Sequence, residues 1–212
     1  ELSPSYINFS DPRYIEIDGI FCSSLLIVDY YREQRDLIFK DLIDINININ
    51  MSIFYERKDP YKIIKDLTYN IGNAAVDLKS SNNRQDIDLV EFTYDDAKYI
   101  RKQLQVNSEE FYYIYAYITV YCSNLKELNI NINKIEGILQ SRGITTKKAY
   151  FRQEQAYIST LPLMINHCDV KEASKRNILT EGLVATYPFI SSSICEKNGI
   201  FIGKNLYNNS LI

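Results

Sequence analysis

Two long runs of alternating residues constrain the fold of this chain more than any other feature. In residues 43–53, isoleucine or methionine occupies every second position, with asparagine, aspartate or serine between. In residues 109–122, one alternate set is aliphatic and the other is rich in tyrosine. A period of two places each set on its own face of a β-strand. Both runs therefore predict half-buried strands of a sheet.

Further strands and one hairpin are predicted around these two runs. Residues 14–17 alternate, and Asp18-Gly19 follows, a two-residue turn signal in which both positions tolerate positive φ. Residues 20–30 then form the return strand. Residues 144–151 and the short run 200–202 also have the composition of strands.

Helices are predicted between the strands from end signals and 3.6-residue periodicity. Asp59 precedes Pro60 in the manner of an N-cap and a first helical residue, and an apolar stripe continues to Leu78. Asn124 and Glu127 form a capping-box pair, and Gly143 predicts the end of that helix. Other helices are predicted at 33–43, 94–105, 153–160, 169–178 and 180–186.

One pentapeptide, Asn-Ile-Asn-Ile-Asn, occurs twice, at 46–50 and at 129–133. We expect a strand at the first site and a helix at the second, because five residues carry little preference of their own and the flanking caps decide.

The order of these elements predicts an α+β fold. Two ferredoxin-like β-α-β units should build a mostly antiparallel sheet, with the helices packed largely on one face. We expect residues 1–163 to form this α+β domain. Residues 164–212 should contribute short helices and a hairpin that lead to a further domain.

Composition and motifs exclude several classes of function. The formal charge is −3 and the pI about 5.3, whereas nucleic-acid-binding domains usually carry a strong basic excess. Neither phosphate-binding motif, G-x-x-x-x-G-K-[ST] or G-x-G-x-x-G, is present. The single histidine, His167, and the four scattered cysteines do not have metal-site spacing. We therefore expect no catalysis, no ATP binding, no metal and no direct nucleic-acid binding by this chain.

An ordered series of short motifs occupies the last third of the chain. It starts with QAYISTLPL at Gln155, continues with RNILT at Arg176 and LVATYPF at Leu183, and ends with NGIFIGKN at Asn198. In order and spacing the series resembles the VirB4/TraE/TrbE-type ATPases of conjugative type IV secretion systems. The positions that carry the resemblance are Gln155, Pro162, Arg176, Thr180, Pro188, Phe189, Gly199, Gly203 and Asn205.

The resemblance implies a non-catalytic N-terminal interaction or scaffold domain that precedes the motor domain of such an ATPase. ATP and Mg²⁺ are expected in that motor domain. The implied partners are the chain's own ATPase domain, inner-membrane components of a conjugation channel, and further copies in a homo-oligomer. The implied location is the cytoplasmic side of the inner membrane, peripherally attached. Absence of an initiator Met agrees with a piece of a longer protein.

Two alternative functions are also consistent with the residues. In the first, the chain is a stand-alone ferredoxin-like adaptor unrelated to secretion. In the second, it is an enzyme whose site gathers scattered Asp and Glu side chains.

The row Tyr113, Tyr115, Tyr117 and Tyr121 has two interpretations. It is a sheet face partly covered by a helix or loop, with hydroxyls reaching water, or a docking face for another subunit.

Overall fold

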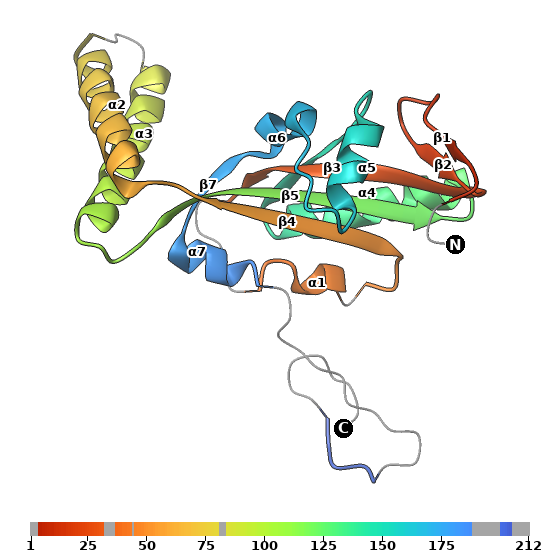
Figure 1. Ribbon diagram of the computed structural model, residues 1–212. Helices are drawn as coiled ribbons and strands as arrows, with labels where there is room; N and C mark the ends of the chain where they lie inside the picture. The colour runs from red at the N-terminus through yellow and green to blue at the C-terminus, as the bar shows by residue number, and fades with distance from the viewer. Residues whose placement is uncertain (1–3, 32–36, 44, 81–83, 188–199, 205–212) are drawn as a thin grey trace.

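The computed structural model describes residues 4–31, 37–43, 45–80, 84–187 and 200–204 (Figure 1). Its strands are β1 (Ile7–Asn8), β2 (Ile15–Ile17), β3 (Ile20–Tyr30), β4 (Ile49–Arg57), β5 (Phe111–Cys122), β6 (Ile144–Lys148) and β7 (Arg176–Leu179). Its helices are α1 (Lys40–Ile43), α2 (Pro60–Ser80), α3 (Arg84–Gln105), α4 (Leu125–Ser141), α5 (Gln153–Thr160), α6 (Cys168–Ser174) and α7 (Thr180–Ala185).

All strands belong to one sheet, and every strand pair in it is antiparallel. The four longest strands lie in the order β6-β3-β5-β4. In each β-α-β unit, the two strands are separated by a strand of the other unit: β5 lies between β3 and β4, and β3 between β5 and β6. This is the split arrangement of a ferredoxin-like fold. The predicted α+β class with a mostly antiparallel sheet is confirmed.

Apolar residues cover both faces of this sheet. On one face, α1 and α4 pack on alternate residues of β3 and β5, including Leu25, Ile118 and Val120. On the other, α5 and α6 cover Leu26, Tyr115 and Tyr117 (Figure 1). The long helix α4 lies on the first face, as expected, but the second face has its own helical cover. Placement of the helices largely on one face is therefore wrong, because the two short C-terminal helices fold back onto the tyrosine side.

The predicted turn between β2 and β3 and the predicted N-caps of α2 and α4 are all present. The turn between β2 and β3 places Asp18 at φ 46° and Gly19 at φ 79°. Asp59 Oδ1 accepts a hydrogen bond from Tyr61 N, 3.0 Å, at the start of α2. Asn124 Oδ1 accepts from Glu127 N, 2.8 Å, at the start of α4. Each bond satisfies a backbone donor that the first helical turn leaves without an intrahelical partner.

The first alternating run becomes a strand later than expected. Ile43 ends α1 and is exposed, and β4 begins only at Ile49. In the register of β4 with β5, residue 47 would lie opposite Cys122, where β5 ends, so the preceding residues have no strand to pair with. Ile45 and Ile47 nevertheless pack on the same core as Ile49. The alternation thus correctly predicted which side chains of residues 45–53 pack on the core. It wrongly predicted that strand pairing begins at residue 43.

Other predicted bounds also differ from the structure. Helix α1 starts at Lys40, and residues 37–39 of the predicted helix 33–43 are not helical. Strand β6 ends at Lys148 rather than at residue 151. α3 starts at Arg84 rather than at residue 94. The expected helix 169–178 ends at Ser174, and β7 follows, because Arg176 to Leu179 pair with the start of β5. Residues 200–202 are not in a strand, and their side chains are 67–88% exposed. The change from helix to strand at residues 176–179 depends on pairing with β5, which is distant in the sequence.

A helical hairpin projects from one end of the sheet. α2 and α3 connect β4 to β5, pack against each other, and stand away from the remaining elements (Figure 1). The predicted stripe from Ile63 to Leu78 faces the interior of this hairpin, with Ile71 only 8% exposed. None of the described helices combines the length and the hydrophobicity that crossing a bilayer requires.

Candidate functional site

The tyrosine row of β5 lies beneath α5, α6 and the loop between them. Tyr115 and Tyr117 are 1% and 0% exposed. The hydroxyl of Tyr117 donates to Asn166 Oδ1, 2.6 Å, and the hydroxyl of Tyr121 accepts from Asn50 Nδ2, 2.9 Å. Tyr113 stacks edge-on with Phe111. An exposed docking face or a row of solvated hydroxyls at Tyr115 and Tyr117 is therefore ruled out, because helices after residue 152 seal it.

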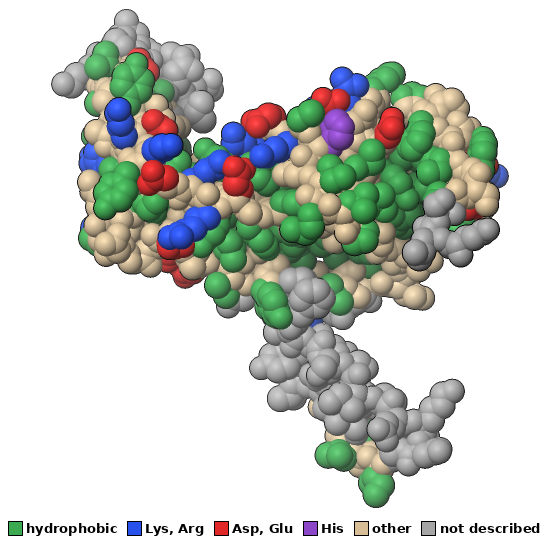
Figure 2. All heavy atoms as spheres, viewed as in Figure 1, with side chains coloured by type: hydrophobic (Ala, Val, Ile, Leu, Met, Phe, Trp, Pro, Cys, Tyr) green, Lys and Arg blue, Asp and Glu red, His purple; other side chains and the backbone are tan. Residues whose placement is uncertain are grey.

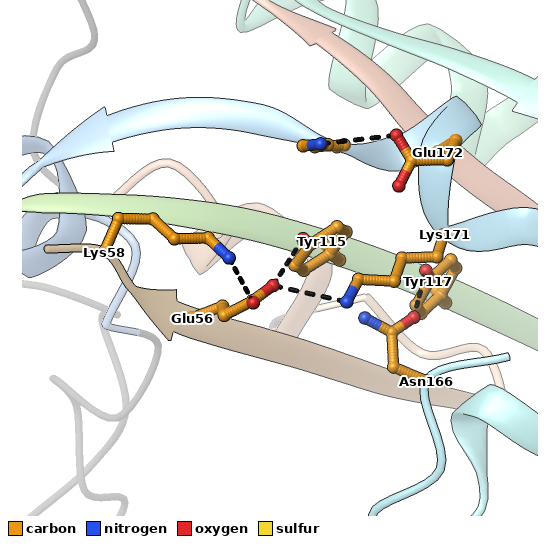
Figure 3. A network of polar contacts seen from close by, with 8 residues as sticks. Glu56, Lys58, Tyr115, Tyr117, Asn166, Lys171 and Glu172 are labelled. Carbon is orange, nitrogen blue, oxygen red and sulfur yellow. Dashed lines mark hydrogen bonds and ion pairs between the residues drawn. The ribbon is translucent and has the colours of Figure 1, made fainter. Parts of the chain in front are cut away.

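A carboxylate, Glu56 of β4, is surrounded by donors at the edge of this row (Figure 3). It accepts from the hydroxyl of Tyr115, 2.8 Å, and pairs with Lys171 of α6, 3.2 Å. It also forms an ion pair with Lys58. The hydrogen bond from Lys58, followed by those from Tyr115 and Lys171, lowers the pKa of Glu56 to about 2. Glu56 is thus an ionised acceptor that joins β4 to Tyr115 of β5 and to Lys171 of α6.

Lysine side chains lie over two of the tyrosine rings. Lys58 Nζ is 5.0 Å and Lys175 Nζ is 4.5 Å from the centroid of the Tyr113 ring. Lys171 Nζ is 5.1 Å from the centroid of the Tyr115 ring. Glu172 pairs with Lys175, 3.3 Å. These charges gather on the surface between the α2–α3 hairpin and α6 (Figure 2). Each lysine has a carboxylate and a ring as partners, so the cluster ties α6 to the sheet.

A buried seam of hydroxyls and one amide joins the C-terminal helices to the sheet. Ser24 and Thr119 bond through their hydroxyls at 2.7 Å, and Thr119 bonds with Thr160 of α5 at 2.8 Å. Gln153 Oε1 accepts from Ser24 N, 2.7 Å. Ser174 of α6 donates to the carbonyl of residue 27, 2.8 Å. Buried polar groups need such partners. Neither this seam nor the contacts of Glu56 could be predicted from a sequence motif, because both depend on which strands are neighbours.

The family-motif positions do not converge on one site. Gln155 lines a shallow hollow of about 290 Å³ with Phe9, Phe151 and neighbouring residues. Pro162 lies on the loop after α5. Arg176 pairs with Asp29, 3.5 Å, and Thr180 Oγ1 accepts from Glu110 N, 2.9 Å.

Of the remaining motif positions, only one lies within the described residues. Gly203 is described, and beyond its two chain neighbours no other described heavy atom lies within 4 Å of the position that a Cβ would occupy there. Pro188, Phe189, Gly199 and Asn205 lie outside the described residues.

One group of described residues has metal-ligand chemistry. The ligand atoms of His167, Cys168 and Asp169 lie within 4.8 Å of one another. His167 Nδ1 accepts from Asp169 N, 3.3 Å, and caps α6, while Cys168 Sγ donates to Asp169 Oδ1, 3.7 Å. Metal binding at Nδ1 would break this cap. The geometry therefore assigns these residues to the start of α6, and the expected absence of metal stays a prediction.

The projecting hairpin carries several large apolar side chains on its surface. On α2, Tyr61, Tyr69 and Val76 are 84%, 71% and 64% exposed. On α3, Phe92 and Tyr99 are 60% and 53% exposed. Spacings of seven or eight residues place each set on one side of its helix, opposite the stripe that packs in the hairpin. Exposed apolar surface of this kind marks interaction sites.

No protein-family model matches the chain, and no curated protein matches it.

Proposed function

We propose that this chain is a non-catalytic interaction domain of a VirB4-type conjugation ATPase, in which the α2–α3 hairpin is the docking element. The observation that carries the proposal is the hairpin itself: two long helices inserted between β4 and β5, with aromatic side chains on their outer sides. The sheet is closed on both faces without it. Such an insertion adds surface for a partner rather than stability for the core.

The attribution to conjugation rests on the motif series from Gln155 to Asn205. In this proposal the motor domain follows the chain and supplies ATP and Mg²⁺ chemistry. The hairpin then contacts either that domain or an inner-membrane channel component at the cytoplasmic side. The contacts of Glu56 with Lys58, Tyr115 and Lys171 support a non-catalytic role, since they join β4 to β5 and α6.

Two measurements on the complete gene test this proposal. First, the coding sequence after residue 212 should encode a Walker A motif; a sequence without one contradicts the conjugation attribution and favours the stand-alone adaptor.

Second, the double variant Tyr61→Ser/Tyr69→Ser in the full-length protein should lower DNA transfer between cells by at least about tenfold, the equivalent of 1.4 kcal/mol.

The matched control for the hairpin variant is Tyr6→Ser, which removes a tyrosine of 52% exposure far from the hairpin in the sequence. Tyr6→Ser should transfer DNA at the wild-type frequency. Protein levels should be equal in all three strains. Normal transfer by the hairpin variant contradicts docking through α2, whereas equal losses in both variants indicate a general effect of removing surface tyrosines.

A further inference from the structure

Strand β4 borders the sheet and presents a long, unpaired backbone edge among the described residues. Tyr121 N donates to the carbonyl of residue 48, and Lys58 N donates to the carbonyl of residue 111. Hydrogen-bonded positions alternate along an antiparallel pair. Even-numbered residues of β4 therefore bond to β5. The odd-numbered ones direct N–H and C=O groups outward: Ile49, Met51, Ile53, Tyr55 and Arg57.

The other border strands carry protection that β4 lacks. β1 has two residues and β7 has four. β6 has five, includes Lys147 and Lys148, and pairs with β3 through an irregular register. Short length, lysines and bulges are the usual means of preventing edge-to-edge pairing. β4 has nine residues, no proline, and charges only at Glu56 and Arg57.

We propose that the β4 edge pairs antiparallel with β4 of a second copy of this chain, about a two-fold axis at Ile53. This goes beyond the docking role of the α2–α3 hairpin and does not depend on it. In this register, every outward-facing residue of one strand meets an outward-facing residue of the other. Ile53 lies opposite Ile53 of the second copy, Met51 opposite Tyr55, and Ile49 opposite Arg57.

Charge and packing favour a second copy in this register. Glu56 lies opposite Asn50, and Arg57 opposite an isoleucine, so no like charges face each other. Ile49, Met51 and Ile53 are only partly buried against the first core cluster, and Tyr55 is 42% exposed. Joining two sheets here continues that apolar face from one copy to the next. Main-chain bonds along an edge are a recurring mode of recognition.

Sedimentation equilibrium of the chain over micromolar concentrations tests the proposal, with two kinds of variant. Ile53→Pro removes an outward N–H and no bond to β5, so it should abolish the dimer. Asn50→Glu places like charges opposite each other and Asn50→Lys places opposite charges there, each twice in the dimer. Asn50 is exposed, and both variants remove the amide that donates to the Tyr121 hydroxyl, so their comparison isolates the charge at residue 50.

The expected result is a wild-type dimer that Ile53→Pro makes monomeric. Asn50→Glu should raise the dissociation constant by about fivefold or more relative to Asn50→Lys. A chain that stays monomeric at all concentrations overturns the proposal. So does a dimer in which the two Asn50 variants associate equally. If circular dichroism shows that Ile53→Pro is unfolded, the Asn50 pair alone decides.

Discussion

At the scale of single residues, the burial of Tyr115 and Tyr117 makes this face of β5 part of the core rather than a docking surface. Tyr117 is as buried as its neighbour Ile118, although the two side chains point to opposite faces. The hydroxyls of Tyr115, Tyr117 and Tyr121 each have a hydrogen-bond partner, which offsets the cost of removing them from water. These tyrosines therefore pack against α5 and α6 and hold both helices on the sheet.

Substitutions at these two positions should therefore be comparably severe. We expect Ile118→Ala and Tyr117→Ala each to lower the free energy of unfolding by about 2–5 kcal/mol, because both leave a cavity in a packed layer. Tyr117→Phe should cost only about 0.5–1.5 kcal/mol, since it loses the bond to Asn166 but keeps the ring. Urea denaturation measures all three. A small loss for Tyr117→Ala alone would mean that its face is open to water.

The Glu56 cluster predicts a specific loss of stability in acid. Its pKa is lowered from 4.5 to about 2 in the folded chain, so the folded state favours the ionised form. That contribution is fully present above pH 4.5 and is lost as pH falls through about 2. Glu56→Gln lacks it. The wild-type advantage in unfolding free energy should therefore shrink between these pH values.

Denaturation curves of the two proteins at a series of pH values measure this difference. The exposed carboxylate Asp66, changed to Asn, provides the control and should follow the wild-type pH dependence. A wild-type advantage over Glu56→Gln that stays constant across the acid range would show that the Lys58 and Lys171 contacts contribute nothing to stability.

At the scale of elements, alanine substitution should have opposite effects on stability at two glycines, one inside α4 and one just after its end. Gly143 has φ +73°, and a Cβ there would lie 2.7 Å from the Cβ of Tyr31. Gly137 lies inside α4 with open space around it. We expect Gly143→Ala to destabilise by about 1–2 kcal/mol or more, from the left-handed backbone and the contact. Gly137→Ala should stabilise by about 0.5–1 kcal/mol.

Thermal unfolding of the two alanine variants gives the comparison within one helix. Opposite shifts of the melting temperature are expected. Stabilisation by Gly143→Ala would mean that α4 continues past its observed end, contrary to the stop that residue 143 provides.

At the scale of the whole molecule, the hairpin should be separable from the sheet. Lys58 N donates to the carbonyl of residue 111, so the two strands are already closed at the base of α2 and α3. Among the residues of α2 and α3 whose burial is described, none belongs to the two core clusters. We expect a variant with residues 60–107 replaced by a short glycine-containing turn to unfold cooperatively. Hydrogen exchange should show protected β3 and β5 amides in that variant. Loss of this protection would make the hairpin part of the core.

Strand and helix types were largely predictable because they depend on local periodicity and end groups. The Asp18-Gly19 turn, the Asn124 cap and helix 153–160 all occur where expected. The identical pentapeptide is helical at 129–133, where a cap precedes it, and reaches a strand only at 49–50. These signals span only a few neighbouring residues, so they can be recognised in the sequence without knowledge of the tertiary structure.

The candidate sites, in contrast, were decided by tertiary structure. Glu56 meets Lys171 across more than a hundred residues, and the tyrosine row is buried only because α5 and α6 return to its face. The sequence by itself determined which side of each strand is apolar and where most helices begin. Only the folded chain decided which faces are covered and which edge stays open, because burial and strand pairing arise between segments whose approach no local pattern specifies.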